Sequence, residues 1–555
     1  MLHPASSAPA EAPADYDALV RAFRWRIPER YNIAVDACDR WAAAEPERVA
    51  LVHVPETGAV ETWRYGDLAR ASNRFAHALA AHGVARGDRV ALLLPQSPPT
   101  LIAHLAVYKL GAIAVPLANL FGVDALRYRL GHSGAAAVVT DTAGLAKIQD
   151  IRDDLPELRL VVSTGETPGD ALGFSGLLER GRDAFEVVAS TPDDPAMMIY
   201  TSGTTGQPKG ALHAHRVLPG HLPGIRMAQE FLPRPGDLFW TPADWAWAGG
   251  LLNALLPALA LGVPVVSHRF EKFDPERAFA LMADMGVTNA FIPPTALKML
   301  RAVPDPRSRF ALALRAVGSA GEALGRDTYD WARDRLGLTV NEFYGQTECN
   351  AVLASCAGIG VTRAGAIGRP VPGHTVGIIA EDGRECAAGE QGQIAIRRPD
   401  PVMFLRYWND AAATRDKFVG DWMTTGDQGV RDGDGYVHFV GRDDDIITSA
   451  GYRIGPGEIE DCLLSHPAVA LAAAVGKPDP VRTEIVKAFV VTKPGVSGDA
   501  ALEENIREHV RTRLSAHEYP REIAFVDALP LTTTGKVIRR LLREGGAAAP
   551  ALAEE

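Results

Sequence analysis

Cysteine is scarce in this sequence and is not arranged for metal or disulfide chemistry. The 555 residues include 5 cysteines, an odd number, and no two of them form a C-x-x-C pair. Neither a zinc site nor a disulfide framework is therefore indicated. Reduced thiols, and with them a cytoplasmic location, fit the sequence best.

The sequence also lacks an excess of basic residues. It contains 57 Lys and Arg against 68 Asp and Glu, which gives a formal net charge of -11 at pH 7. Because binding to nucleic acid needs a basic face, no nucleic-acid partner is expected. The hydrophobic share of 47% and the charged share of 23% are ordinary for a globular protein.

No segment is typical of a secretory signal or a membrane span. Residues 1–15 are rich in Ala and Pro without a basic or an apolar region, so we predict a disordered tail there and another at 545–555. The longest uncharged run, 245–267, has the length of a membrane span but is interrupted by Pro257 and Pro264. We interpret it as a buried helix followed by a buried strand, and expect no integral membrane segment.

A chain of 555 residues is too long for a single core, so two or more domains are expected. Helical and strand patterns alternate from about residue 62, without an internal repeat. The sequence predicts helices at 65–82, 99–110 and 123–130 and strands at 89–94, 113–116 and 136–140. This alternation is typical of an α/β fold with doubly wound, mostly parallel sheets.

The pattern changes in the last third of the chain. Turns rich in Gly and Asp at 382–383 and 432–435 indicate short antiparallel hairpins. After 441–442 a new pattern begins. It predicts helices at 456–465 and 501–514 and strands at 469–475 and 484–491. We therefore expect one large domain followed by a small α+β domain.

The most informative segment is 200–210, Tyr-Thr-Ser-Gly-Thr-Thr-Gly-Gln-Pro-Lys-Gly. Glycines allow positive φ and bring backbone N–H groups close to a ligand. Together with the hydroxyls these groups form an anion-binding concavity, to which Lys209 adds a charge. A plain surface loop would explain some of these residues but not all of them in this order. We interpret the segment as a phosphate-binding loop, although the G-x-x-x-x-G-K-[ST] spacing of a P-loop is absent.

Three further segments contain candidate binding groups. Residues 318–322, Gly-Ser-Ala-Gly-Glu, are expected to be the end of a strand that opens into a loop. In 341–348, Tyr344 offers a face for adenine, and Glu348 an oxygen ligand for magnesium bound to triphosphate. Asp427, which we expect in a turn, could accept hydrogen bonds from two ribose hydroxyls.

In this order the segments resemble the adenylate-forming, or AMP-binding, superfamily of acyl-CoA synthetases, aryl-CoA ligases, luciferases and peptide-synthetase adenylation domains. Residues 446–460 closely resemble the medium-chain acyl-CoA synthetases, down to Gly-Tyr-Arg-Ile-Gly-Pro at 451–456. Residues 529–536, Leu-Pro-Leu-Thr-Thr-Thr-Gly-Lys, match the superfamily's C-terminal lysine loop. The matches together span 200–536.

The resemblance implies an N-terminal AMP-binding domain at 16–441, with doubly wound sheets and a small barrel-like region. A hinge at 442–446 would connect it to a mobile C-terminal lid domain at 447–544. Asp444 aligns with the hinge residue, and its neighbour Asp443 stays an alternative. Such enzymes activate a carboxylate with ATP as an acyl-AMP, release pyrophosphate, and transfer the acyl group to a thiol after the small domain rotates.

The resemblance also assigns roles to individual residues. ATP would be held by Thr201, Ser202, Gly203, Thr204, Thr205, Gly206, Lys209, Gly321, Glu322, Tyr344, Gly345, Gln346, Thr347, Asp427, Arg442, Arg453 and Lys536. Lys536 would be catalytic by bridging the carboxylate and the α-phosphate, and Thr204 and Glu348 would hold magnesium. Coenzyme A is expected at Ala450, Gly451, Tyr452, Arg482 and Arg511. For the last two arginines, simple rim contacts are an equal alternative.

The sequence says less about the acid. In acetyl-CoA synthetases a tryptophan fills the acyl pocket immediately after the aromatic residue that Tyr344 matches. This chain has Gly345 there, so we expect acetate to be a poor substrate and a medium-chain or short branched aliphatic acid to be preferred. The remaining pocket walls would be Trp247, Gly249, Gly250 and Gly318, whereas Trp245 is equally well explained as core.

Three alternatives remain. A benzoate-type aryl-CoA ligase would use the same pocket design. Asp244 resembles the aspartate with which amino-acid adenylation enzymes grip an amino group, but the chain has no carrier domain. A nucleotide-binding protein without catalysis is disfavoured because Lys209, Glu348 and Lys536 are all present. The expected partners are therefore a carboxylic acid, ATP and CoA. The sequence leaves the oligomeric state open, a homodimer included.

Overall fold

The computed structural model describes residues 15–201, 207–443, 445–449, 452–479, 482–514, 519–532 and 536–544. The tails predicted at 1–15 and 545–555 lie outside these residues, except for Asp15. Its carboxylate accepts a 2.7 Å hydrogen bond from the Ala18 N–H and caps α1 (Tyr16–Ala22). Within the described ranges, no helix is long and apolar enough to cross a membrane.

One large sheet has eight strands in the order β19-β9-β8-β4-β3-β5-β6-β7. They are β3 (Arg89–Leu93), β4 (Ile113–Pro116), β5 (Ala135–Thr140), β6 (Leu160–Ser163), β7 (Leu172–Gly173), β8 (Pro195–Thr201), β9 (Lys209–Ala214) and β19 (Arg406–Tyr407). Strands β3 to β8 pair in parallel, whereas β9 and β19 are antiparallel additions at one edge. The strands predicted near 89, 113 and 136 are confirmed.

The other large sheet has nine strands in the order β16-β15-β14-β13-β12-β10-β11-β1-β2. They are β1 (Val49–His53), β2 (Glu61–Arg64), β10 (Phe239–Trp240), β11 (Val265–Ser267), β12 (Asn289–Phe291), β13 (Ala316–Ser319), β14 (Val340–Gln346), β15 (Cys349–Ala354) and β16 (Arg369–Pro370). The strands from β14 to β1 are parallel, and β2, β15 and β16 are antiparallel edges.

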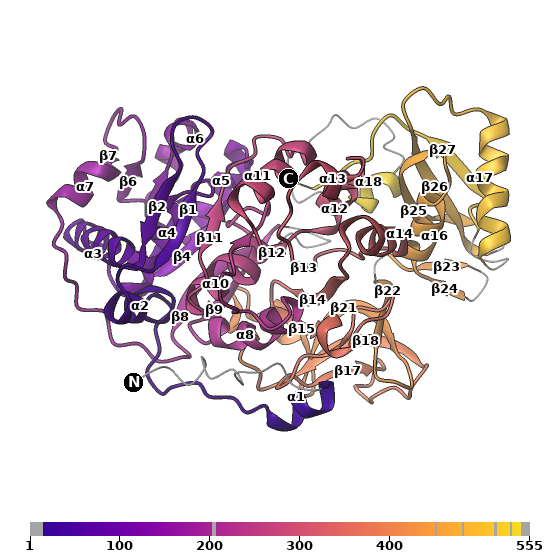
Figure 1. Cartoon of the computed structure of the whole chain (residues 1–555), viewed down its shortest axis with the longest axis horizontal. Helices are drawn as coiled ribbons and strands as arrows, with labels where there is room; N and C mark the ends of the chain where they lie inside the picture. The colour runs from indigo at the N-terminus through magenta and orange to yellow at the C-terminus, as the bar shows by residue number, and fades with distance from the viewer. Residues whose placement is uncertain are drawn as a thin grey trace.

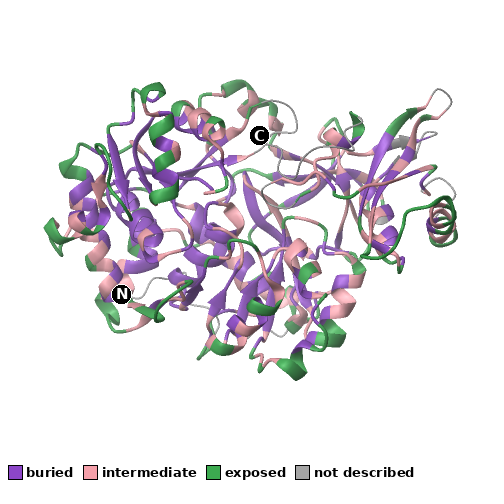
Figure 2. Cartoon of the chain, turned by 90° about the horizontal axis from the view of Figure 1, so that it is seen from above, coloured by how far each residue is buried: buried purple, intermediate pink, exposed green. Residues whose placement is uncertain are grey.

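Both faces of these sheets are buried. Val90 and Leu92 of β3 belong to one apolar cluster, and the alternate residues Ala91 and Leu93 belong to another. Because side chains alternate along a strand, a sheet covered on both sides has continuously apolar strands. Figure 2 shows the strands of the large sheets as largely buried.

Helices lie between the two sheets and on their outer faces (Figure 1). The helices α3 (Tyr65–Ala81), α4 (Pro98–Lys109), α8 (Val217–Ala228), α9 (Ala248–Gly250) and α10 (Leu256–Ala260) share the central cluster with strands of both sheets. The outer faces are covered by α5 (Val123–Ser133), α6 (Thr142–Asp150), α11 (Pro275–Met285) and α12 (Pro294–Leu300). The result is a helix–sheet–helix–sheet–helix stack, which confirms the doubly wound prediction. The run 245–267 is, as predicted, buried helix followed by strand β11.

Four of the histidines that are buried in this stack have lowered pKa values. Burial lowers the pKa of His104 and His213 to about 3. It lowers the pKa of His215 and His221 to about 4. At neutral pH these side chains are therefore uncharged, and His104 shares a 3.0 Å hydrogen bond with the Tyr108 hydroxyl.

An antiparallel sheet follows the stack, where a barrel-like region was expected. Its strands are β17 (Val376–Ile379), β18 (Gln391–Arg397), β20 (Phe418–Val419), β21 (Trp422–Arg431) and β22 (Val437–Arg442). The predicted hairpin turns at 382–383 and 432–435 lie between paired strands. The expectation of a turn at 422–427 is wrong. This segment is the first part of β21, because its backbone pairs with β18 and, through Asp427, with Arg442 of β22.

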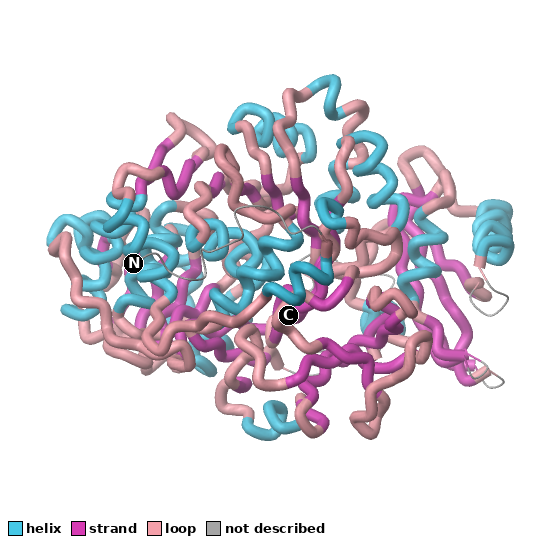
Figure 3. Tube along the Cα trace, turned by 60° about the horizontal axis from the view of Figure 1, so that its bottom comes forward, coloured by secondary structure: helices cyan, strands magenta, loops and turns pink. Residues whose placement is uncertain are grey.

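The small domain is the α+β unit that the sequence predicts. It contains β23 (Ile447–Ser449), β24 (Tyr452–Ile454), α16 (Pro456–Leu464), β25 (Val469–Asp479), β26 (Thr483–Thr492), α17 (Ala500–Arg513), β27 (Glu522–Phe525) and α18 (Arg539–Arg543). Strands β25 and β26 are longer than predicted because their antiparallel pairing continues to Asp479 and Thr483. This domain has its own apolar core, and α17 lies at the outer end of the molecule (Figure 3).

Candidate active site

The predicted phosphate-binding segment connects two antiparallel strands. Thr201, the last residue of β8, pairs with Lys209, the first residue of β9, and both are half-buried. Strand β8 also pairs in parallel with β4, so the connection begins at the carboxyl end of a parallel strand, where α/β sheets bind ligands. The predicted residues Ser202, Gly203, Thr204, Thr205 and Gly206 lie outside the described residues.

Helix α5 braces both flanks of this connection. The Tyr128 hydroxyl donates a 3.0 Å hydrogen bond to the Pro208 carbonyl on the far side. On the near side, the Tyr200 hydroxyl donates to the Arg129 carbonyl at 3.2 Å and lies 2.8 Å from His132 Nδ1. Sequence reasoning missed this support, because the aromatic residues of α5 resemble ordinary core positions.

The side chain of Tyr407 contacts both Lys209 and Glu348. The ammonium of Lys209 lies 5.3 Å from the centroid of the Tyr407 ring, and the Tyr407 hydroxyl donates a short hydrogen bond to Glu348. Strand β19 pairs with β9, and its residue Tyr407 lies opposite Ala211, two residues after Lys209. Burial, with the charge of Glu348, raises the pKa of Tyr407 above its usual value, so it is a neutral donor. No local pattern distinguishes Tyr407 from a core aromatic.

Glu348 is suited to a magnesium ion that arrives with triphosphate. Its side chain is buried, with 6% of the residue exposed. Magnesium is usually bound through one or two carboxylates and the phosphates of the substrate, without a full protein cage. In keeping with this, the described part of the chain has no group of three or more His, Cys, Asp or Glu that could hold a metal ion.

Four predicted ATP-binding residues meet at Asp427. The Tyr344 hydroxyl and Gln346 Nε2 donate to Asp427 Oδ2 at 2.5 and 2.7 Å, and Arg442 donates to Oδ1 at 3.1 Å. Asp427 is only 4% exposed, and burial raises its pKa while Arg442 and the two donors oppose this shift. Lys417, which sequence reasoning missed, extends the cluster by donating to Gln346 Oε1 at 3.3 Å.

The segment 318–322 is the predicted strand end that opens into a loop. Strand β13 ends at Ser319, and Gly321 has a φ of +103°, a conformation that glycine adopts without strain. Glu322 accepts a 2.9 Å hydrogen bond from the Thr295 hydroxyl. Strand β13 is the parallel neighbour of β14, which contains Tyr344, and the half-buried Thr347 follows β14.

The small domain reaches this loop. A Cβ added to Gly325 would lie 2.9 Å from Oδ1 of Asp461, which is in α16. Nearby, burial raises the pKa of Glu342 to about 8, a shift that the Leu324 N–H opposes and the charge of Asp461 reinforces. The small domain therefore approaches the same edge of the sheet that carries Tyr344.

Two of the predicted pocket glycines face one pair of aromatic rings. A Cβ on Gly249 would lie 3.0 Å from Phe291, and a Cβ on Gly318 would lie 3.2 Å from Phe343. The centroids of these two rings are 5.6 Å apart. The rings, which sequence reasoning missed, therefore occupy the space beside both glycines.

The other predicted pocket residues lie in different surroundings. A Cβ on Gly345 would lie 2.4 Å from Asn350 Cα, so the main chain of β15 requires a glycine here. A Cβ on Gly250 would similarly collide with the Asp244 carbonyl at 2.2 Å. Trp247 is half-buried and packs edge-on against Phe121, at 5.7 Å between centroids. Trp245 is fully buried in the central cluster, as the core interpretation expects.

The predicted catalytic lysine is in a hairpin of the small domain. The Lys536 N–H donates to Thr532 Oγ1 at 3.0 Å, and the Lys536 carbonyl accepts from the Thr532 N–H at 2.7 Å. The adjacent residues Leu531 and Val537 form an isolated antiparallel β-bridge. The residue is exposed, so the hairpin presents Lys536 to solvent.

The remaining predicted residues are dispersed over the small domain. Tyr452 and Arg453 belong to β24. The Arg482 N–H donates to Asp479 at 2.8 Å, and the exposed Arg511 pairs with Glu508 of its own helix at 2.7 Å. Residues 444, 450 and 451, the predicted hinge residue and two predicted CoA-binding residues, lie outside the described residues.

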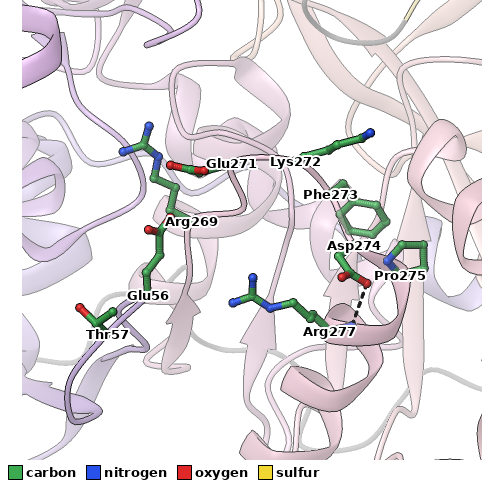
Figure 4. A pocket seen from close by; sticks show the side chains of 9 residues that line it. All are labelled: Glu56, Thr57, Arg269, Glu271, Lys272, Phe273, Asp274, Pro275 and Arg277. Carbon is green, nitrogen blue, oxygen red and sulfur yellow. Dashed lines mark hydrogen bonds between the residues drawn. The ribbon is translucent and has the colours of Figure 1, made fainter.

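A surface hollow of about 610 Å³ has none of these residues in its lining (Figure 4). It is lined by Glu56, Thr57, Arg269, Glu271, Lys272, Phe273, Asp274, Pro275 and Arg277. Asp274 caps α11 by accepting hydrogen bonds from the N–H groups of Glu276 and Arg277. The three cations are matched by three carboxylates, so the hollow does not indicate a ligand of one charge.

The chain resembles known proteins along almost all of its length. Residues 38–408 match the family "AMP-binding enzyme", and residues 458–536 match "AMP-binding enzyme C-terminal domain". The human mitochondrial acyl-coenzyme A synthetase ACSM4 is 33% identical over 96% of this chain and 93% of its own.

Two solved structures share the fold. The acyl-CoA synthetase of Brucella canis is 35% identical and has a TM-score of 0.74, over 96% of this chain and 98% of its own. The anthranilate CoA ligase AuaEII in complex with anthranoyl-AMP is 28% identical and has a TM-score of 0.86, over 94% and 98% of the two chains.

The two large sheets, the antiparallel sheet and the small α+β domain are the architecture of a two-domain nucleotide-dependent ligase. The chain belongs to the AMP-binding enzyme family, among its acyl-CoA synthetases.

Proposed function

We propose that this enzyme converts a medium-chain or short branched carboxylic acid to its acyl-CoA in two half-reactions. In the first, the carboxylate attacks the α-phosphorus of ATP and pyrophosphate leaves. In the second, the thiol of CoA attacks the acyl carbonyl and AMP leaves. The observation that carries the proposal is the meeting of Tyr344, Gln346 and Arg442 at Asp427, in a chain that matches the two family models at residues 38–408 and 458–536.

Adenylate formation brings two anions together, so the protein must neutralise charge and align the attack. Asp427 would accept the ribose hydroxyls, and Arg442 favours its ionised form. Lys209 and the hydroxyls of Thr201, Ser202, Thr204 and Thr205 would hold the β- and γ-phosphates. Lys536 would bridge the carboxylate and the α-phosphate. A magnesium ion held by Glu348 and Thr204 would supply further positive charge.

Thioester formation requires Lys536 to leave and a thiol to enter. The small domain would rotate about Asp444, and Ala450, Gly451 and Tyr452 would then line the passage for the pantetheine arm. Arg482 and Arg511 would contact the phosphates of CoA, and Arg453 would meet phosphate in one of the two orientations. A cytoplasmic location is part of the proposal and agrees with five free cysteines.

Aryl acids are the second candidate. The tilted rings of Phe291 and Phe343, beside Gly249 and Gly318, are aromatic groups that a ring-bearing acid could contact. The similarity to an anthranilate CoA ligase supports the same alternative.

A coupled assay of pyrophosphate release tests the proposal. The acids would be acetate, butyrate, hexanoate, 2-methylbutyrate, benzoate and an amino acid, each with and without CoA. We expect the highest kcat/KM for an aliphatic acid of four or more carbons, and turnover that depends on CoA. A maximum at benzoate would favour the aryl alternative. Release with no carboxylate at all would overturn the proposed function.

A further inference from the structure

The side chains of the residues on either side of Asp444 are attached to different domains. On the N-terminal side, the two carboxylate oxygens of Asp443 accept 2.5 Å hydrogen bonds from Gln393 and Gln428. These glutamines belong to β18 and β21 of the antiparallel sheet, and the Asp443 N–H donates to Gly426 at 2.8 Å. Asp443 is therefore fixed to the large domain.

On the C-terminal side, the Asp445 N–H donates to the Arg442 carbonyl at 3.0 Å, whereas the Asp445 carboxylate is fixed to the small domain by two arginines of α18. Arg543 donates to Asp445 Oδ1 at 2.8 Å, and Arg539 donates to Oδ2 at 3.3 Å. Arg539 also donates to both oxygens of Glu460 at 2.8 Å. Glu460, in α16, in turn accepts the N–H of Ala474 in β25 at 2.9 Å. One arginine thus connects the segment after Asp444 to two helices and, through Glu460, to the sheet.

The arginine clamp, defined here as Arg539 with Asp445 and Glu460, is protected from water. The side chain of Arg539 is 19% exposed, and those of the two carboxylates are 15% exposed each. Charge-assisted hydrogen bonds that engage both oxygens of a carboxylate are stronger and more directional than ordinary surface pairs. Loss of Arg539 would leave two partly buried carboxylates without this partner, which disfavours the present arrangement.

The clamp lies at the base of the hairpin that presents Lys536. The Ile538 N–H donates to the Pro530 carbonyl at 2.9 Å, and α18 begins at the next residue, Arg539. A displacement of α18 would therefore displace the Lys536 hairpin relative to Asp445.

We propose that Arg539 is a positioning residue that makes the segment after Asp444 and the Lys536 hairpin turn as one body. This proposal rests on the proposed function, in which Lys536 must reach the α-phosphate. Without the clamp, residues 445–449 absorb part of the rotation and Lys536 arrives out of place. A misplacement of about 1 Å can lower a reaction rate about 100-fold. In this proposal Arg539 affects the rate through the position of Lys536 and does not touch the substrate.

The test measures adenylate formation, as single-turnover release of pyrophosphate, for Arg539→Met and Arg539→Lys. We expect Arg539→Met to lower the rate about 10–100-fold with little change in the KM for ATP. The lysine variant keeps the charge but cannot engage two carboxylates in a fork, so it recovers only part of the rate. The matched control is Arg507→Met, because Arg507 is 26% exposed and pairs with two carboxylates, Glu503 and Glu504, within its own helix α17. The control should retain the wild-type rate.

A double variant separates positioning from simple destabilisation. If Arg539 acts through Lys536, then Lys536→Ala combined with Arg539→Met is no slower than Lys536→Ala alone. Multiplied losses, or an Arg539→Met enzyme as fast as the control, would overturn the inference. Asp445→Asn, which keeps the shape of the clamp, repeats the test should Arg539→Met fail to fold. A wild-type enzyme that releases no pyrophosphate with any acid refutes the proposed function instead, so the two failures are distinguishable.

Discussion

At the scale of single residues, the side chains at the candidate nucleotide site hold one another in place. Asp427 is fixed by Tyr344, Gln346 and Arg442, and Glu348 is fixed by Tyr407. Polar groups that are oriented before the reaction need no reorganisation when charge develops. We therefore expect these side chains to keep nearly the same positions when the nucleotide binds. Some of their hydrogen bonds to one another would be replaced by hydrogen bonds to the nucleotide.

Replacement of Lys536 by alanine should separate the two half-reactions. Adenylate formation should fall roughly 10²–10⁴-fold, the scale of removing one positioned group from a transition state. Synthetic acyl-AMP with CoA should still give thioester at nearly the wild-type rate, because the proposed rotation removes Lys536 from the site for that step. Single-turnover measurement of each half-reaction checks this. Equal losses in both would contradict the proposed rotation.

The chain-length preference should respond to Gly249 and Phe291 in opposite directions. Gly249→Ala places a methyl group against the Phe291 ring, so activity on hexanoate should fall more than activity on acetate. Phe291→Ala removes the ring and should extend the preference to longer acids. A missing methylene changes discrimination by about 10–200-fold, which sets the expected scale. The measurement is kcat/KM over acids of two to eight carbons. Parallel changes for all acids would place the acyl pocket elsewhere.

The residue scale also shows where sequence reasoning stops. Tyr344, Gln346 and Asp427 could be predicted because each lies in a motif of fixed order. Tyr407 and Lys417 could not, since each reaches the site only through strand or side-chain pairing across more than 50 residues. The opening of the acyl pocket by Gly345 stays a prediction, and the close approach of the β15 main chain is a second reason for a glycine there. Gly345→Trp would therefore displace main chain and report little about the acid.

At the scale of elements, strand and helix types were predicted well and their ends less well. Apolar periodicity located α3, β3 and α4 to within a residue or two. It missed the continuation of β25 to Asp479, because the last residues of that strand are polar and are fixed by pairing with β26. Asp427 is predicted in a turn, but it lies within β21, next to a shift in the register of this strand with β18, and it pairs with Arg442 of β22. Cross-strand pairing is not visible in local sequence.

The proposed hinge at Asp444 can be tested by restricting its backbone. Asp444→Pro fixes φ near −65° and should restrict rotation. Adenylate formation should survive while thioester formation from acyl-AMP collapses, the mirror image of the lysine variant. Asp443→Pro is a less informative comparison, because it also removes the N–H that donates to Gly426. The two half-reactions, measured separately for Asp444→Pro, decide the matter. Normal thioester formation would move the hinge away from this residue.

At the scale of the whole molecule, the buried histidines should make the large domain sensitive to acid. Unfolded histidines have a pKa near 6.5, whereas His104, His213, His215 and His221 have pKa values of about 3 to 4 in the fold. The unfolded chain therefore binds more protons between these values, and stability is lost as the pH falls from about 6.5 towards 4. Each histidine contributes a slope of up to about 1.4 kcal/mol per pH unit.

Thermal unfolding between pH 7.5 and pH 4.5 measures this effect. We expect Tm to be nearly level above pH 7 and to fall with increasing steepness below pH 6.5. His104→Gln should reduce the pH dependence of the free energy of unfolding by the contribution of one histidine, up to about 1.4 kcal/mol per pH unit. A Tm that stays constant down to pH 5 would show that the histidines take up protons without loss of the fold.

The pairing of β9 with β19 has a consequence for how the protein is made. Strand β9 is synthesised roughly 190 residues before β19, the strand that pairs with its open edge. At typical translation rates the delay is about 10–40 s. During that time the backbone donors and acceptors of β9 are an unpaired template for any other extended chain. We therefore predict that the edge of β9 stays exposed to wrong pairing until β19, with Tyr407, has been synthesised.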